Sequence, residues 1–259
     1  MKKITSIDEM RAIELDVMKK IHEFCINNDI QYFLSHGTLI GAVRHNGFIP
    51  WDDDVDIYMP RPDFVKFSQL FPQKEKILNL KLMTHEDIGR PVIKVTDNRT
   101  LVIETEYIDS PPVGVWVDIW PLDGISSNAI KQKLDLLRVC FYKRVLYFKK
   151  IAEIEGVINK ITKLFVKAVP SSLANRRITK IMTLYSYEKS RDLICYCDPY
   201  KTKLKRQWFN SMELHKFENY NFCIPKGYDD ILHAIYGDYM KLPPLDKQNP
   251  HHVFNAYWK

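Results

Sequence analysis

The sequence predicts an α/β (α+β) protein in which a small mixed sheet flanked by helices precedes a mostly helical, basic region. Apolar residues recur at helical spacing in the first 27 residues, alternate over 51–59, and return to helical spacing over most of 129–187. Hydrophobic residues make up 46% of the chain and charged residues 27%, which excludes a disordered protein. A chain of 259 residues forms one large domain or two small ones.

The first part of the chain supplies the sheet and its flanking helices. Ser6 and Glu9 form a capping box, in which the serine caps the first helix and the glutamate reaches back to the backbone. The apolar pattern predicts a short helix around 39–43 and a helix from Pro62 to about Leu70. Strands are expected at 30–34, 51–59, 92–96, 100–105 and 113–120.

Charge is unevenly divided along the chain. Residues 131–206 hold 19 Lys and Arg against 6 Asp and Glu, a local net charge of +13, whereas the whole chain carries +6. We therefore predict a catalytic core at 1–128, a basic helical region at 129–206, and a C-terminal segment at 207–259 that returns to complete the active site. Basic amphipathic helices lie on anionic membranes or bind phosphate-bearing glycans, and packing on the core with a solvated basic side is the alternative. No nucleic-acid-binding motif accompanies the charge, so nucleic acid is not expected as a partner.

The five cysteines are sparse and irregularly spaced, which indicates a reducing compartment. No signal-peptide pattern or membrane-length apolar run is present, so we expect a cytoplasmic protein, peripheral at the inner face of the membrane. Cys195, Cys197, Cys223 and His215 match zinc spacing poorly, and buried free thiols are the default interpretation.

The densest chemical signal is the acidic segment 51–57. Asp54 and Asp56 lie two apart on a predicted strand, so both carboxylates should leave the same face and need a cation, for which Mg²⁺ or Mn²⁺ is suited. A solvated loop is disfavoured by the apolar residues around them, and a calcium loop fails because Ile57 replaces the required glycine. The D-x-D site of sugar-nucleotide glycosyltransferases normally follows ~90 residues or more of nucleotide-binding fold, and too few precede Asp54.

Gly37 and Thr38 follow the first buried strand. A small pair at a strand-to-helix turn lets backbone N–H groups approach a phosphate. Alone this is a weak signal, but together with the alternating Asp54 and Asp56 it resembles the pattern of the nucleotidyltransferase superfamily, where such carboxylates hold metal beside nucleotide phosphates.

The longer segment HGTLIGAVRHNGFIPWDDDVDI at 36–57 closely resembles the signature of the LicD family, bacterial cholinephosphotransferases related to fukutin-type enzymes. The resemblance continues at 116–123 (WVDIWPLD), at 217–218, at 224–225 and at 236–244 (YGDYMKLPP). It implies a nucleotidyltransferase-like fold and metal-dependent transfer of a phospho-alcohol, phosphocholine first, from a CDP-alcohol such as CDP-choline. The acceptor would be a hydroxyl of a cell-surface glycan, lipid-linked or not, in lipopolysaccharide, teichoic acid or capsule, and CMP would leave.

The same resemblance places Asp54 and Asp56 at the metal-binding pair and Asp118 at the third carboxylate. Asp118 lies in an otherwise apolar strand and needs a cation or a donor, although a turn cap or an arginine pair is the alternative. It is also a candidate to accept the acceptor's proton. Two further pairs are candidates for binding the nucleotide and its phosphates, with surface exposure or packing as their alternatives: Arg44 and His45, and Asp238 and Lys241.

Two other functions stay open at this point. A nucleotidyltransferase would use the same carboxylates to move NMP from an NTP, releasing pyrophosphate instead of CMP. A non-catalytic glycan-binding or membrane-surface protein would keep the fold without using the carboxylates. The alcohol is also open between choline, ribitol and glycerol, because a choline cage needs aromatic residues and the sequence contains many.

Overall fold

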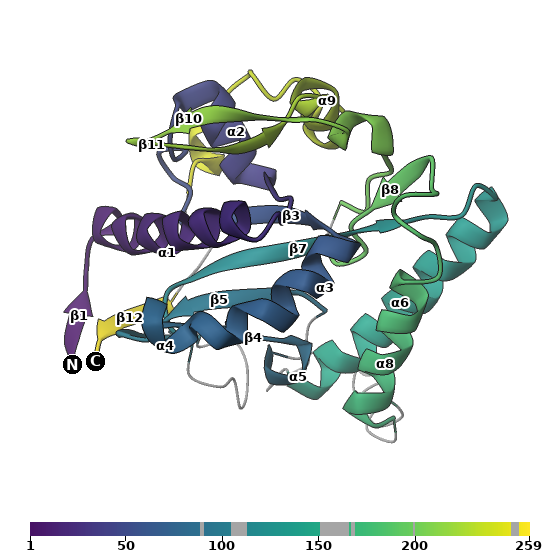
Figure 1. The fold of residues 1–259 in the computed structure, drawn as a ribbon, viewed down its shortest axis with the longest axis horizontal. Helices are drawn as coiled ribbons and strands as arrows, with labels where there is room; N and C mark the ends of the chain where they lie inside the picture. Colours follow the sequence, from purple (N-terminus) through teal and green to yellow (C-terminus); the bar gives the residue numbers. More distant parts are fainter. Residues whose placement is uncertain (89–90, 105–112, 151–165, 167–168, 199, 250–253) are drawn as a thin grey trace.

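A mixed sheet forms the centre of the molecule, and its described strands follow the order β2-β3-β7-β5-β4 (Figure 1). The computed structural model describes every residue except 89–90, 105–112, 151–165, 167–168, 199 and 250–253. Strands β3 and β7 are parallel and the other neighbours in this order are antiparallel, so the α/β (α+β) prediction is confirmed. The strands are β2 (Phe33–Leu34), β3 (Asp56–Pro60), β4 (Leu80–Met83), β5 (Ile93–Asp97) and β7 (Trp116–Gly124).

Helix α1 (Ile7–Asn27) begins at the predicted cap and packs on β5 and β7. The Ser6 hydroxyl accepts a hydrogen bond from the Asp8 N–H at 3.1 Å. The prediction for Glu9 is wrong, because its carboxylate accepts a hydrogen bond from the Trp258 indole at 2.8 Å. A strand from the far end of the chain thus supplies the donor, which local sequence pattern does not reveal.

The acidic segment enters the sheet later than predicted. Strand β3 begins at Asp56, so Asp54 lies in the loop just before the strand, whereas the alternating pattern predicted both residues on the strand. The cause is Arg11 of α1, whose guanidinium donates to the carbonyl oxygens of residues 49, 50 and 52 and holds this stretch as a loop. Those carbonyl groups therefore do not pair with a neighbouring strand.

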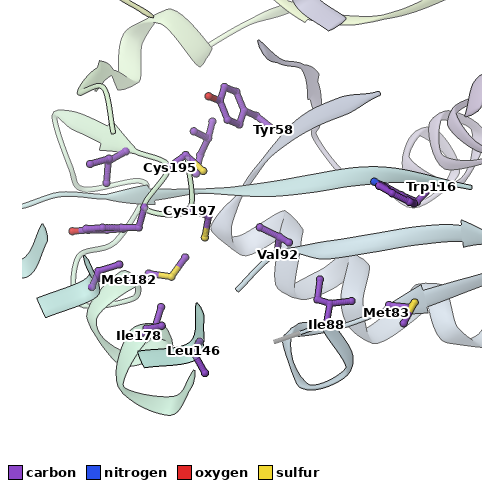
Figure 2. Packing of buried hydrophobic residues seen from close by; sticks show 14 of the residues in the cluster. Tyr58, Met83, Ile88, Val92, Trp116, Leu146, Ile178, Met182, Cys195 and Cys197 are labelled. Atoms are coloured by element: carbon purple, nitrogen blue, oxygen red, sulfur yellow. The ribbon is translucent and has the colours of Figure 1, made fainter. Parts of the chain in front are cut away.

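Short helices follow β3 on the way to β4 and β5: α3 (Arg61–Leu70), η1 (Phe71–Lys74), α4 (Glu75–Leu78) and α5 (His85–Ile88). Beyond β7, helices α6 (Ala129–Lys150) and α8 (Ser171–Met182) pack together (Figure 1). Their inner faces share a core cluster with Tyr58 and Trp116 of the sheet and with the free thiols of Cys195 and Cys197 (Figure 2). The described part of the basic region therefore shares a hydrophobic core with the sheet.

Later segments return to both ends of the sheet. Strand β8 (Asp192–Ile194) pairs with the end of β7 and with β9 (Leu204–Lys205), after which η2 (Arg206–Phe209) follows. The hairpin β10 (Met212–Phe217) and β11 (Tyr220–Pro225) packs on β2 and on α2 (His36–His45), and α9 (Tyr228–Tyr236) also contacts α2. A last short turn, η3, spans Leu245–Lys247.

A second sheet joins the two ends of the described chain. Strand β12 (Phe254–Trp258) lies between β1 (Lys2–Ile4) and β6 (Thr100–Glu104), antiparallel to both. The strand predicted at 100–105 therefore exists, but it belongs to this sheet. Among the described residues, no helix has the length and apolar character needed to cross a membrane.

Candidate active site

Two backbone contacts fix Asp56 at the start of β3. Its N–H donates to the Thr38 hydroxyl at 2.9 Å, and its carbonyl oxygen accepts from the Ser35 N–H at 3.0 Å. Thr38 is buried at the N-terminal end of α2. The Gly37–Thr38 turn was predicted to approach a phosphate, and in the structure the threonine hydroxyl holds the backbone of the neighbouring carboxylate residue.

Asp118 lies beside Asp56, because the two residues are register partners on the parallel strands β3 and β7. Two tryptophans on the same strand hold the pair: the Trp120 indole donates to Asp56 Oδ1 at 2.7 Å and the Trp116 indole donates to Asp118 Oδ2 at 2.9 Å. Lys94 Nζ lies 3.3 Å from Asp118 Oδ2. Asp118 therefore lies on the strand next to that of Asp56, and its charged partner is a lysine.

The loop before β3 brings a further carboxylate, Asp52, against the start of α2. A Cβ atom on Gly37 would lie 2.3 Å from Asp52 Oδ2, so only glycine leaves room for that carboxylate. Arg11 holds the Asp52 carbonyl oxygen at 2.7 Å. The glycine therefore serves the packing of a carboxylate against the helix start.

Burial and mutual repulsion make these carboxylates hard to ionise. Burial, the charges of Asp54 and Asp53, and a hydrogen bond to Asp54 raise the pKa of Asp52 to about 7, against the opposing effect of Arg11. Burial and the charges of Asp54 and Asp118 also raise the pKa of Asp56 well above its ordinary value. The site therefore favours binding of positive charge.

Glu14 of α1 contributes a fifth acidic group close to the same loop. Its side chain is buried, and Oε2 has no hydrogen-bond partner in the described structure. Burial and the charges of Asp54, Asp53 and Asp52 raise its pKa well above the ordinary value. Burial and the neighbouring negative charges thus both disfavour the ionised form of Glu14.

The donor set fits a divalent cation that also binds substrate oxygens. Mg²⁺ in nucleotide sites takes one or two protein carboxylates and completes its shell with phosphate oxygens and water. Asp54 and Asp56 offer such a pair, and Asp118 Oδ1 is buried with no hydrogen-bond partner in the described structure. No three His, Cys, Asp or Glu side chains within the described ranges form a preassembled metal site, which applies both to the carboxylates and to the cysteines considered for zinc.

A cavity of about 510 Å³ opens beside the carboxylates. Six of the nine predicted site residues line it: Gly37, Arg44, Asp54, Asp56, Asp238 and Lys241. The same cavity has a largely aromatic wall, formed by Trp51, Trp120, Tyr200, Tyr236 and Tyr239. The C-terminal segment thus reaches the cavity through residues that follow α9, among them Asp238 and Lys241.

Arg44 and His45 differ in their placement. Arg44 lines the cavity, where its guanidinium donates to the carbonyl oxygen of Tyr239. His45 does not line the cavity, and its ring accepts a hydrogen bond from Arg44 Nε at 3.0 Å. Burial and the charge of Arg44 lower the pKa of His45, which suits an acceptor. The role in nucleotide binding stays a prediction for both.

The LicD/FKTN/FKRP nucleotidyltransferase family model matches residues 29–148, which include Asp52, Asp54, Asp56 and Asp118. A protein of Haemophilus influenzae, lipopolysaccharide cholinephosphotransferase LicD, is 32% identical over 269 aligned positions that cover 99% of this chain and 99% of that one. The chain belongs to the LicD family. This confirms the family predicted from the motif at 36–57.

Shorter similarities to this LicD-family chain were found in other organisms. An uncharacterized protein of Rickettsia typhi is 44% identical over 72 residues, which is 27% of this chain and 23% of that protein. Mannosyltransferase regulator 4 of Saccharomyces cerevisiae is 28% identical over 132 residues, or 48% of this chain and 11% of that protein. These similarities cover only parts of the proteins, so the family assignment depends on the Haemophilus relative.

The LicD-family site also contains a buried network that sequence analysis did not find. The His36 imidazole lies between two carboxylates, with Nδ1 at 3.7 Å from Asp56 Oδ2 and Nε2 at 3.1 Å from Asp198 Oδ2. The Tyr58 hydroxyl donates to the same Asp198 oxygen at 3.1 Å. Burial raises the pKa of Asp198, but hydrogen bonds from His36, the Tyr200 N–H and Tyr58 outweigh it and hold the pKa below its ordinary value. An ionised Asp198 thus orients His36 toward Asp56.

Proposed function

We propose that this LicD-family transferase moves phosphocholine from CDP-choline to a hydroxyl of a cell-surface glycan and releases CMP. The acceptor oxygen forms a bond to the phosphorus that carries choline, and the bond from that phosphorus to the oxygen bridging to CMP breaks. The acceptor's proton passes to a basic group of the site, and CMP leaves with the electron pair of the broken bond. The observation that carries the proposal is the cluster of Asp52, Asp54, Asp56 and Asp118 beside the cavity.

Asp54 and Asp56 would hold Mg²⁺, or Mn²⁺, with Asp118 as a third carboxylate beside Asp56. When bound, the cation neutralises phosphate charge and stabilises the attacking and leaving oxygens. The protein's own groups fix the donors: Trp120 fixes the Asp56 carboxylate, and Lys94 fixes that of Asp118. The protein thus orients the carboxylates, and metal and substrate together would balance their negative charge.

Two cations of the cavity support nucleotide binding. Arg44 and Lys241 both line the cavity, as does Asp238, which shortly precedes Lys241 in the chain. Guanidinium and ammonium groups bind phosphate oxygens through charge-assisted hydrogen bonds. His36, held by Asp198, is placed to accept or hold a proton near Asp56.

The aromatic wall supports choline as the alcohol. Quaternary ammonium groups bind to the faces of Trp and Tyr rings, whereas ribitol and glycerol would need hydrogen-bond partners for their hydroxyls. Tyr200 and Tyr236 pack edge to face with ring centroids 5.1 Å apart. Burial and the neighbouring Tyr200, Asp198 and Asp56 raise the pKa of Tyr236, so its ring stays neutral beside the carboxylates.

The acceptor and the location complete the proposal. A lipopolysaccharide-type glycan, lipid-linked during its synthesis, would be met by a cytoplasmic protein at the inner face of an anionic membrane. The positive net charge of residues 131–206 supports peripheral contact with such a surface.

The test uses purified protein with CDP-choline, Mg²⁺ and a lipopolysaccharide acceptor, and quantifies CMP by chromatography and choline on the acceptor by mass spectrometry. CDP-glycerol, CDP-ribitol and CTP serve as competing donors. Asp54→Asn should lose activity, whereas Asp246→Asn, on an exposed turn, should keep it.

Each alternative has its own outcome in this experiment. Pyrophosphate released from CTP would support the nucleotidyltransferase that moves NMP. Transfer from CDP-glycerol or CDP-ribitol would change the alcohol and keep the reaction type. Acceptor binding without any nucleotide product would support the non-catalytic glycan- or membrane-surface-binding protein.

A further inference from the structure

Helix α6 carries an apolar stripe on its outer side. Four of its apolar side chains are between 53% and 72% exposed: Ile130, Leu134, Leu137 and Phe141. At about 100° per residue they fall within a sector of about 60° along the first three turns. On the opposite side, Val139 and Leu146 are buried in the core. The core therefore explains one apolar side of α6 and leaves the other unexplained.

Basic residues border this stripe on both edges. Helical spacing places Lys133 and Arg144 along one edge and Lys131 and Arg138 along the other, and all four are exposed. The helix has seven Lys and Arg but one acidic residue, Asp135, which is buried. The outer surface of α6 is thus apolar along its middle and cationic at its margins.

We propose that this face of α6 lies on the surface of an anionic lipid bilayer. Helices that lie in the membrane interface place an apolar stripe at the boundary of head groups and acyl chains, and their Lys and Arg residues meet anionic head groups. Helix α6 would then make the membrane contact that belongs to the proposed function. The inference rests on that function, because the proposed function places the acceptor at the membrane. The stripe and the basic edges would act together, since either one alone gives weak membrane binding.

The position of α6 in the fold suits this role. The helix lies at one edge of the molecule and packs against α8 (Figure 1). Only residues 125–128 separate it from the end of β7, the strand that holds Asp118. A bilayer on the outer face of α6 would therefore be coupled to the strand of the active site by a short connection.

Other occupants fit this surface less well. A second copy of the chain would bring two sets of cationic edges together, which repel one another. A nucleic acid would use the charges but would leave the apolar stripe in water. An acidic protein with an apolar groove is the remaining alternative partner. The experiment below contains vesicles and no other protein, so binding in it can only be to lipid.

The test is flotation of the purified full chain with vesicles of phosphatidylcholine alone and of phosphatidylcholine with phosphatidylglycerol in equal parts. The wild type should float with the anionic vesicles, and raised salt should weaken this binding. The double variant L137E/F141E should bind at least about tenfold more weakly. The matched control I77E/L214E changes two exposed apolar residues outside α6 and should bind as the wild type does.

The proposal is overturned if the wild type does not bind anionic vesicles, or if L137E/F141E floats as well as the wild type. Equal loss in I77E/L214E would also overturn it, because the effect would then not belong to α6. A second assay measures release of CMP with a soluble acceptor fragment, which needs no membrane and therefore tests the proposed function separately from the membrane contact. L137E/F141E should retain that activity, and absence of CMP from the wild type would defeat the proposed function while leaving the vesicle result valid.

Discussion

Two adjacent parts of the site treat negative charge differently. On β7, Asp118 has the ammonium group of Lys94 at 3.3 Å and the indole of Trp116 at 2.9 Å. Around the start of β3, Asp52 and Asp56 are buried close to Asp54, and both have raised pKa values. The protein thus compensates one carboxylate and leaves the charge of the others only partly compensated. The difference indicates where metal and substrate should enter.

The largest expected effect is at Asp56. Asp56→Asn should lower kcat/KM for CMP release at least about 10³-fold, because it removes a carboxylate proposed to hold the metal, whose charge acts on the transition state. Asp118→Asn should cost less, about tenfold to a hundredfold, because Lys94 already neutralises that carboxylate. Steady-state kinetics with saturating Mg²⁺ measure both. Equal losses in the two variants would erase the distinction between the two sides.

The next effect concerns stability. Lys94→Met should lower the free energy of unfolding by about 2–3 kcal/mol, because it leaves Asp118 largely buried without its cation. The matched control is Lys203→Met, which removes an exposed partner of Asp192 at 3.7 Å and should change stability by less than about 1 kcal/mol. Urea denaturation at pH 7 gives both values. A Lys94 variant as stable as its control would show that β7 does not depend on this pair.

The effect at Asp52 has the opposite sign. Its folded pKa of about 7 lies above the value of about 3.9 in an unfolded chain, so the folded state holds more protons between these values. The metal-free wild type should therefore lose stability as the pH rises from about 4 to about 7. Asp52→Asn should be more stable than the wild type by about 1–2 kcal/mol at pH 8 and equal to it below pH 4.

Urea denaturation of metal-free protein across this pH range measures the effect of Asp52. Exposed Asp246→Asn should change little at any pH. A wild type whose stability rises over the same interval would contradict the prediction. Added Mg²⁺ should reduce the difference in free energy of unfolding between the wild type and Asp52→Asn if the cation binds beside the carboxylates whose charge is only partly compensated.

The smallest expected effect is on choline recognition. The wild type should bind CDP-choline about tenfold more tightly than its uncharged analogue, in which carbon replaces the quaternary nitrogen. Tyr200→Leu should reduce this preference several-fold, and Tyr200→Phe should keep it because the ring is retained. Tyr147→Leu is the matched control, since the two tyrosines are 48% and 51% exposed and only Tyr200 lines the cavity. Calorimetric titration measures these affinities, and equal binding of the two ligands by the wild type would contradict the proposal. If Tyr200→Leu weakened CMP binding as much as CDP-choline binding, Tyr200 would contact the cytosine ring instead.

Sequence patterns predicted the parts of the site that are close together along the chain. Asp54 and Asp56 could be found because acidic and apolar residues alternate over a few positions, and Gly37 because a small residue follows a buried strand. The strand bounds were less accurate, since Arg11 holds residues 49–52 as a loop from a distant helix. Local pattern contains no information about such a contact.

The distant parts of the site could not be predicted for the same physical reason. Lys94 faces Asp118 because β5 and β7 are antiparallel neighbours in a particular register. Asp198 reaches His36 from a turn 162 positions later in the chain. Nothing in the sequence around it, which follows Cys195 and Cys197, indicates this contact. The first contact needs the strand order and the second needs the packing of the basic region. Neither follows from spacing along the sequence.

The second sheet has a consequence for how the chain is made. Strand β12 is the middle strand of that sheet, so β1 and β6 have no partner there until residues 254–258 have been synthesised. Cotranslational folding of the central sheet can therefore proceed while strand β1 still lacks its partner strand β12. The Trp258 indole donates to Glu9 at the beginning of α1, so this contact also forms only after β12 has been synthesised. A chain stalled before β12 would lack the strand that joins β1 to β6 in this sheet.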